Sequence, residues 1–414
     1  MALFKPFKAV RPIPERAADV AALPYDVMNS AEAREMAKGN PYSFLHVDKA
    51  EIDLPEGTDL YSAEVYAKAK ENLEKLSEDG VMTEDAQSCF YIYRQTMNGR
   101  SQTGLVGCAS IDDYINNRIK KHEHTRADKE ADRIRHVDTC NANTGPIFLC
   151  YRDEPKAAQI IENWKASHTP VYDFISTGNV GNTVWVVDDA EICAELSSLL
   201  SDAGDFYIAD GHHRCASAVR VGQQRREANP DYTGEEEFNF FLAVLFPQKE
   251  LEIMDYNRVM KDLNGNTPAQ FLKKISEKFI VEEAPTSPYK PTEKHSFGML
   301  LEDKWYKLTA KKGTYDPADP VGQLDVSILQ NNLIAPILGI EDPRRDERID
   351  FIGGIRGLCE IEKRTHKDMY LGFAMYPTTM DDLLDIADCG KVMPPKSTWF
   401  EPKLLSGLFI HRLA

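Results

Sequence analysis

Between residues 147 and 246, short apolar runs alternate with amphipathic runs of helical period, and this alternation constrains the fold more than any other feature. The strand-like runs cover 147–151, 183–187, 205–209 and 238–246, and the helix-like runs cover 156–167, 190–200 and 215–226. Strands that alternate with helices are typical of a sheet whose faces the helices cover. The sequence therefore predicts a mixed α/β fold.

The segments on either side of this core have other patterns. In an N-terminal α+β region, 1–145, helices are predicted over 30–38, 61–79, 112–121 and 126–137, and a hairpin is predicted to turn at Asn98-Gly99. The predicted core spans 146–263. A small α+β insertion is predicted over 264–320, and a C-terminal region that packs on the core over 321–414, with a helix near 327–338.

Charge and cysteine usage narrow the classes of function. The 414 residues include 49 Lys and Arg against 66 Asp and Glu, for a formal net charge of −17. A surface of this sign repels nucleic acids and anionic membranes, so we expect neither as a partner. No apolar run is long enough to span a membrane, and the start lacks the apolar core of a secretory signal. With eight cysteines and no C-x-x-C pair, we expect a cytoplasmic protein without a disulfide framework or structural zinc.

The strongest local signal is the run Asp210-Gly211-His212-His213-Arg214, which separates a predicted strand from a predicted helix. The amino end of a helix offers unpaired N–H groups and a positive dipole end, which favour a phosphate. Arg214 and His213 add donors for the same anion. Asp210 could hold Mg²⁺ or accept a proton from a hydroxyl. The alternative is structural, with Asp210 capping the helix while the two histidines pack locally.

A second polar cluster is His122-Glu123-His124, which is followed by Lys129 and Arg133. Glu123 between two histidines is a candidate metal ligand or general base, although this spacing alone is weak evidence for zinc. On a helix, Lys129 and Arg133 lie one turn apart on the same face. The alternative is a solvated, charged surface helix.

Other polar candidates stand apart from these two clusters. Asp26 lies in the Pro24–Val27 turn and Asn143 precedes the strand-like run at 147–151, and both also fit ordinary turn chemistry. The arginines around Arg344 and Arg348 precede a glycine pair that lacks P-loop spacing, and are spare cations for a phosphate.

Several motifs together resemble the bacterial and archaeal family named domain of unknown function 1015. The motifs that carry this resemblance are Tyr207–Arg214, Asn40–His46, Pro230–Phe240, Leu324–Val326 and Met393–Phe400. The Asp-Gly-His-His-Arg run is also similar to the phosphate-binding motif of the ParB/sulfiredoxin superfamily. This resemblance implies a ParB/sulfiredoxin-like core with N-terminal and C-terminal additions. Because His212 stands where sulfiredoxins have their reactive cysteine, we do not expect sulfinic-acid repair.

Within that superfamily, the motif is similar to that of free-serine kinases, which Asp210, Gly211, His213 and Arg214 match position by position. The resemblance implies a Mg²⁺-dependent phosphotransferase that converts free L-serine to O-phosphoserine, with pyrophosphate or ADP as donor. The catalytic residues would be Asp210, Glu123 and His213, with Asp210 also as the metal ligand. The phosphate would be bound by Gly211, His212, His213 and Arg214. The candidates for substrate binding are Lys129, Arg133, Asn143, His122 and Asp26.

Two alternatives from other classes stay open. One is a hydrolase that removes phosphate from phosphoserine or splits a nucleotide. The other is a ParB-like protein that binds a nucleotide without catalysis. The oligomeric state also stays open, with a dimer as one option.

Overall fold

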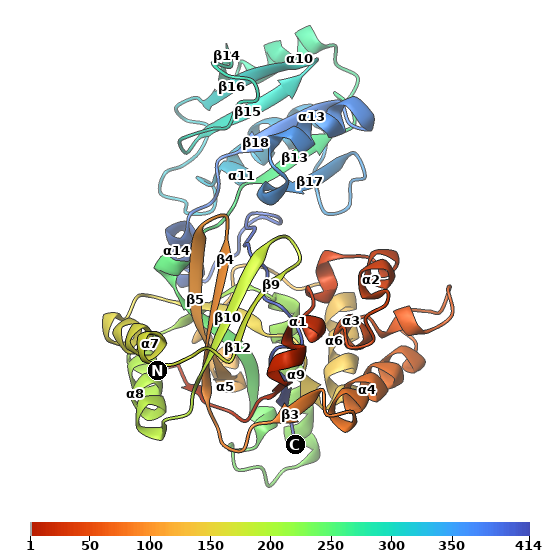
Figure 1. The fold of residues 1–414 in the computed structure, drawn as a ribbon. Coiled ribbons are helices and arrows are strands. Elements are labelled where there is room, and N and C mark those ends of the chain that lie inside the picture. Colours follow the sequence, from red (N-terminus) through yellow and green to blue (C-terminus); the bar gives the residue numbers. More distant parts are fainter. Residues whose placement is uncertain (1) are drawn as a thin grey trace. The chain divides into compact units, whose positions relative to one another are not determined.

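The computed structural model describes residues 2–414, which form two compact units (Figure 1). Of the described residues, the first unit comprises 2–251 and Pro402–Ala414, and the second comprises Glu252–Glu401. The chain therefore leaves the first unit once and returns to it with its last residues. Among residues 2–414, no helix has the length and apolarity that crossing a bilayer requires.

The first unit is built on a nine-stranded sheet with the order β6-β11-β8-β12-β5-β4-β10-β9, and β1 pairs with β5 beside this path. Strand β6 is parallel to its neighbour β11, and β8 is parallel to its neighbour β12. The other paired strands are antiparallel. The strands of this sheet are β1 (Phe4–Lys5), β4 (Phe90–Met97), β5 (Arg100–Ser110), β6 (Ile119–Lys120), β8 (Ile147–Tyr151), β9 (Tyr172–Ser176), β10 (Val180–Val187), β11 (Phe206–Asp210) and β12 (Phe240–Pro247). Two small ribbons pair β2 (Val10–Pro12) with β3 (Met82–Glu84), and β7 (Ala142–Asn143) with β19 (His411–Arg412).

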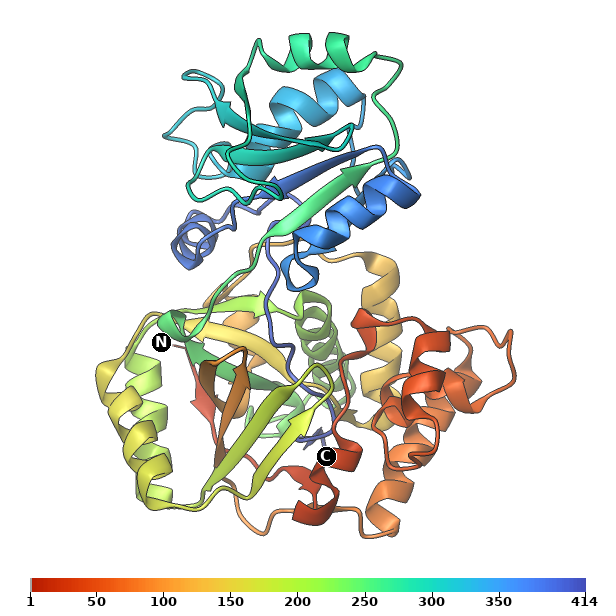
Figure 2. The same ribbon diagram turned by 45° about the horizontal axis from the view of Figure 1, so that its top comes forward.

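Helices gather on two sides of the first unit. Its α-helices are α1 (Ala17–Val20), α2 (Ser30–Ala37), α3 (Leu45–Asp48), α4 (Ala63–Glu78), α5 (Ile111–Ile115), α6 (Ala127–Cys140), α7 (Pro155–Ser167), α8 (Ala190–Asp202) and α9 (His212–Ala228). The short 3-10 turns are η1 (Pro14–Arg16), η2 (Tyr25–Val27), η3 (Ala50–Asp53), η4 (Glu237–Asn239) and η5 (Gln248–Glu250). Helices α7 and α8 lie side by side, across the unit from α2, α3, α4 and α6 (Figures 1 and 2).

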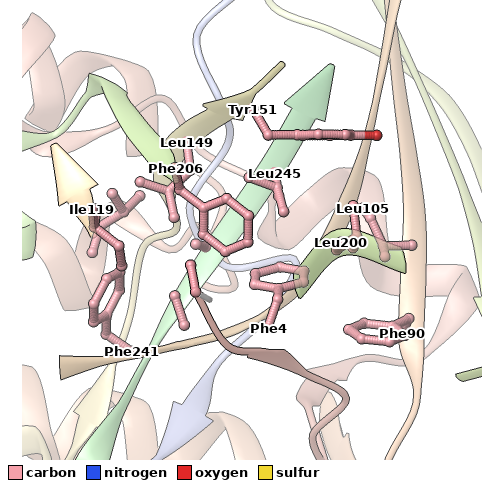
Figure 3. Close-up of a cluster of buried hydrophobic side chains, with 14 of the residues drawn as sticks. Phe4, Phe90, Leu105, Ile119, Leu149, Tyr151, Leu200, Phe206, Phe241 and Leu245 are labelled. Atoms are coloured by element: carbon pink, nitrogen blue, oxygen red, sulfur yellow. The ribbon is translucent and has the colours of Figure 1, made fainter. Parts of the chain in front are cut away.

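Aromatic and aliphatic side chains from most strands of the large sheet form the main core (Figure 3). Phe4 from β1 stacks on Phe90 with ring centroids 5.6 Å apart, and meets the edge of Phe206 at 6.2 Å. Fully burying a side chain of this size contributes roughly 1.5–3 kcal/mol. This packing anchors β11, which ends at Asp210, in the large sheet.

The second unit has its own six-stranded antiparallel sheet with the order β14-β16-β15-β18-β13-β17. Its strands are β13 (Tyr256–Met260), β14 (Phe279–Glu283), β15 (Ser296–Leu301), β16 (Lys304–Ala310), β17 (Ile349–Gly353) and β18 (Leu371–Met375). Its helical elements are α10 (Pro268–Ile275), α11 (Asp325–Leu329), η6 (Gln330–Ile334), α12 (Ala335–Leu338), η7 (Gly354–Arg356), α13 (Leu358–Lys367) and α14 (Met380–Asp388). Arg344 and Arg348, which the sequence suggests as spare cations, pair with Asp342 at 2.9 Å and with Asp346 at 2.8 Å.

The mixed α/β class that the sequence predicts is confirmed. The hairpin also turns where expected, with positive φ angles of 52° at Asn98 and 80° at Gly99. The helix predicted over 112–121 is wrong in its second half. It stops at Ile115, and Asn117 takes a left-handed φ of 56°, because Ile119 gains more by burial in β6 beside β11.

The compact units follow other boundaries than the four segments expected from the sequence. Strands β4 and β5, from the predicted N-terminal region, lie in the same sheet as β8, β11 and β12 of the predicted core. Strand β13, which also falls within the predicted core, lies in the sheet of the second unit. Periodicity along the chain cannot show which distant strands pair, because it reports only local burial.

Candidate active site

The Asp-Gly-His-His-Arg run forms the turn between β11 and α9. Asp210 is the last residue of β11, and α9 begins at His212. Between them, Gly211 takes a left-handed φ of 89°. It occupies the N-cap position of α9, so no side chain caps the first N–H groups of the helix. A Cβ atom at Gly211 would lie only 3.1–3.2 Å from the guanidinium of Arg214. Glycine is therefore needed here both for the turn and for the close approach of Arg214.

The Arg214 guanidinium is fixed but not fully satisfied. Its Nη1 donates to the carbonyl of Pro146 at 2.6 Å. Its Nε is buried and makes no hydrogen bond among the residues that the structure describes. Burial alone would lower the pKa of Arg214, but the charges of Asp26 and Asp210 raise it above its ordinary value. The result is a charged group whose buried Nε–H has no hydrogen-bond partner among the described residues.

Asp210 pairs with a lysine from the returning end of the chain. Lys403 Nζ lies 3.1 Å from Asp210 Oδ2, and the Gly211 N–H donates to Asp210 Oδ1 at 2.9 Å. Burial alone would raise the pKa of Asp210, but the charges of Lys403 and Arg214 hold it well below its ordinary value. Asp210 is therefore a stable carboxylate and a poor proton acceptor.

The parallel pairing of β6 with β11 brings the second polar cluster to the same place. Phe206 is paired with Ile119 and Tyr207 with Lys120, so the two strands end at one edge of the sheet. His122 and Glu123 follow β6 as Asp210 ends β11. The ligand atoms of His122, Glu123 and His212 all lie within 4.8 Å of one another. Glu123, although distant from the motif in the sequence, thus lies beside the start of α9.

His213 joins the loop after β6 to α9. Its Nε2 accepts a hydrogen bond from the backbone N–H of Arg126, the residue that caps α6, at 3.0 Å. Burial is the main reason that the pKa of His213 is lowered, so the ring is neutral and Nδ1 carries its proton. Nδ1 is the atom of this side chain that remains to donate to a phosphate.

The turn η2 supplies a carboxylate and an aromatic ring on the Arg214 side. Among the charged neighbours, Asp26 has the largest effect on these two motif residues: its charge raises the pKa of Arg214 and opposes the lowering of the pKa of His213 by burial. Tyr25 packs under the guanidinium of Arg133, whose centre lies 4.1 Å from the ring centroid. Burial raises the pKa of Tyr25 to about 12, so its hydroxyl stays protonated.

Three of the expected substrate-binding residues make contacts within the protein. Arg133 is buried and pairs with Asp132 at 2.8 Å. Lys129 Nζ lies 3.5 Å from the hydroxyl of Tyr61. Asn143 accepts from the Leu242 N–H at 3.2 Å and contacts His411 at 3.2 Å, which ties β7 to its neighbours.

Sequence reasoning missed the role of Lys403. It lies 193 residues from Asp210, and no motif around it distinguishes it from other surface lysines. The only available signal was a mixture of lysines, hydroxyls and prolines between Met393 and Lys403. That composition suits an anion, but it names no partner for Asp210.

Magnesium fits the Asp210 carboxylate poorly as a resident ion. Mg²⁺ prefers oxygen ligands and keeps several waters, with one or two carboxylates from the protein. Both oxygens of Asp210 are already bonded, one of them to the ammonium of Lys403, and the guanidinium of Arg214 adds a second nearby cation. These positive charges oppose a divalent cation at the same carboxylate.

The close contact at Gly211 leads to a first prediction. Gly211→Ala places a side chain in a left-handed conformation, which costs about 1–2 kcal/mol, and displaces the Arg214 guanidinium. We expect lower stability in denaturant unfolding and weaker pyrophosphate binding in calorimetry. Gly204→Ala is the matched control, because Gly204 has a φ of 102° and open space around it. It should lose stability but not anion affinity, and equal losses of affinity would contradict the role of Arg214.

The Asp210–Lys403 pair leads to a second prediction. Because the pKa of Asp210 is lower in the folded than in the unfolded protein, its carboxylate stabilises the fold above about pH 4 and less as the pH falls. Lys403→Met should remove this contribution. The difference in unfolding free energy from wild type should be largest near neutral pH and shrink towards pH 3. Additive effects of Lys403→Met and Asp210→Asn in the double variant would contradict the pairing.

Comparisons with known proteins identify the family. The family model for the proteins of unknown function DUF1015 matches residues 4–327. Among curated proteins, none matches the chain. A solved free serine kinase in complex with AMP is 13% identical, with 71% of this chain and 86% of that chain covered and a TM-score of 0.36. A conserved hypothetical protein from Pyrococcus furiosus is 14% identical, with 73% and 93% covered and a TM-score of 0.34.

A third solved structure, SbnI with C-terminal truncation from Staphylococcus aureus, is 9% identical, with 73% of this chain and 85% of that chain covered and a TM-score of 0.38. Likenesses this weak identify no activity. The family model, in contrast, spans most of the sequence, including the Asp210–Arg214 turn and the loop that carries Glu123. This chain belongs to the DUF1015 family.

Proposed function

We propose that the protein is a phosphotransferase that phosphorylates the hydroxyl of free L-serine, with ADP or pyrophosphate as donor. The observation that carries this proposal is the β11–α9 turn. There, α9 starts without a side-chain cap, and the fixed guanidinium of Arg214 has a buried Nε without a partner among the described residues. Carboxylates from two other segments adjoin this turn. L-serine as acceptor rests on the likeness of this motif to that of free-serine kinases. The proposal includes a cytoplasmic location.

The donor phosphates are proposed to lie against the start of α9. Phosphoryl transfer depends mainly on positioning and charge neutralisation. The first N–H groups of α9, the Nε of Arg214 and the Nδ1–H of His213 supply donors for the phosphate oxygens. Lys403, held by Asp210, adds a positive charge to this cradle.

The acceptor is proposed to lie between the cradle and Glu123. The serine Oγ attacks the terminal phosphorus of the donor, and the bond from that phosphorus to the bridging oxygen breaks. AMP leaves when ADP is the donor, and orthophosphate leaves when pyrophosphate is the donor. The hydroxyl proton passes to the Glu123 carboxylate, because Asp210 is held ionised by Lys403 and Arg214. Asp26, whose charge acts on both His213 and Arg214, is proposed to bind the serine ammonium group.

Magnesium enters this proposal only with the donor, as the counter-ion of its phosphates. We propose no resident magnesium ion at Asp210, because Lys403 and Arg214 already place positive charge beside its carboxylate. We therefore expect Mg²⁺ to be required in proportion to the donor rather than to copurify with the protein.

The test is phosphorus NMR of the protein with L-serine, Mg²⁺ and each donor in turn, together with matched arginine variants. Arg214→Met should lower the rate of phosphoserine formation about 100-fold or more, as expected for the loss of a charged donor to the transferred group. Arg220→Met is the control, because Arg220 lies on the same helix with its guanidinium 3.8 Å from surface Glu227.

Glu123→Gln should lower kcat by about 10²–10⁴ with little change in donor affinity.

The outcomes separate the proposal from its alternatives. Donor breakdown without phosphoserine would identify a hydrolase instead. A nucleotide that binds but stays intact with serine present would identify a binding protein. Unchanged turnover in Arg214→Met would remove the β11–α9 turn from the reaction.

A further inference from the structure

His122, Glu123 and His212 form a cluster that the proposed reaction does not fully use. Among residues 2–414, it is the one group of at least three His, Cys, Asp or Glu side chains whose ligand atoms approach closely enough for a metal ion. The two rings meet edge to face, with centroids 4.4 Å apart. His122 comes from the loop after β6 and His212 from the first position of α9, so the cluster joins two elements.

The two histidines are buried but lack ordinary partners. Their exposed fractions are 2% for His122 and 5% for His212. Within the described part of the chain, neither nitrogen of His122 and not the Nε2 of His212 makes a hydrogen bond. A buried polar group that is left without a partner costs about 1–3 kcal/mol. This arrangement is therefore expected to hold a ligand that satisfies the rings.

The three side chains offer the kinds of atom that a metal ion binds. A neutral imidazole ring has one nitrogen lone pair for this purpose. Glu123 is more accessible than the histidines and supplies a carboxylate oxygen.

We propose that His122, Glu123 and His212 bind a divalent first-row transition metal such as Zn²⁺, beside the N-terminus of α9. Two imidazoles and one carboxylate suit Zn²⁺ and its neighbours, whereas Mg²⁺ and Ca²⁺ prefer oxygen ligands alone. Typical Zn–N and Zn–O distances of about 2.0–2.2 Å put tetrahedral ligand atoms roughly 3.4 Å from one another. The three ligand atoms lie within 4.8 Å of one another, so each pair would need to approach by at most about 1.4 Å. Three protein ligands leave a coordination position for water or substrate.

The site extends the proposed function without depending on it. A bound ion would fix the loop after β6 to the start of α9 and add positive charge beside the phosphate cradle. Because a carboxylate bound to a divalent cation is a weaker proton acceptor, Glu123 would accept the serine proton less readily while it holds the ion. Metal binding is measured without donor or serine, so it can succeed or fail independently of phosphoryl transfer.

The experiment is a titration of the full chain with Co²⁺ and Zn²⁺ after treatment with a chelator. Its background carries Cys359→Ser and Cys389→Ser, because these two cysteines are exposed and could capture metal. We expect one Co²⁺ per chain, visible ligand-field bands without thiolate charge transfer, and displacement of Co²⁺ by Zn²⁺. Absence of binding at micromolar Co²⁺ and Zn²⁺ would overturn the proposal.

Matched variants locate the site. His122→Gln and Glu123→Gln should each weaken Co²⁺ binding about 100-fold or more and change the bands, since loss of even an outer-shell partner costs 10–100-fold. His124→Gln is the control, because His124 is exposed and lies outside the cluster. Circular dichroism of the metal-free proteins shows whether each variant folds, and the near-isosteric Glu123→Gln keeps the test decisive if His122→Gln does not.

Further outcomes separate the two proposals. Equal Co²⁺ affinity in wild type, His122→Gln and Glu123→Gln would overturn the metal site. Arg214→Met should lose phosphoryl transfer but keep Co²⁺ binding, because Arg214 is not a ligand. Loss of Co²⁺ binding in Arg214→Met together with unaffected binding in Glu123→Gln would place the ion elsewhere and overturn this assignment.

Discussion

The candidate site depends on the return of the chain to the first unit at Pro402. The carbonyl of Lys403 accepts a hydrogen bond from Gln95 of β4 at 2.9 Å, and Ile410 bridges to Val10 near the start of the chain. These contacts fix the backbone so that the Lys403 side chain reaches Asp210. Without this segment, the Asp210 carboxylate would be left beside Arg214 alone, and the cradle would lose one of its cations.

Strand direction explains why so many polar groups meet at one edge of the sheet. Strand β6 is parallel to β11, so the loop with His122 follows β6 where Asp210 ends β11. Strand β8 is antiparallel to β11, so its first residues lie beside the end of β11, and the Pro146 carbonyl there accepts from Arg214. Three segments that are distant in the sequence thus contribute to one site.

The adjacent histidines of the motif serve different neighbours. Successive residues of a helix point about 100° apart, so His212 faces the buried ring of His122 while His213 accepts from the Arg126 backbone. In the proposed function, His213 and Arg214 bind the donor phosphate. In the proposed metal site, His212 acts with His122 and Glu123. The start of α9 therefore concentrates basic side chains, although the whole chain has a net charge of −17.

The sequence by itself determined the local features of this protein: the mixed α/β class, the Asn98-Gly99 hairpin, and the strand–glycine–helix turn of the motif, because these follow from short-range periodicity and backbone preference. It also indicated Glu123 as a candidate metal ligand or general base, but it did not show that Glu123 lies close to the motif. Only the tertiary structure decided that Lys403 pairs with Asp210, that His212 faces His122, and that Asn143 ties strands together. Those contacts join residues far apart in the chain, and strand order and direction, which local patterns do not encode, decide which of them form.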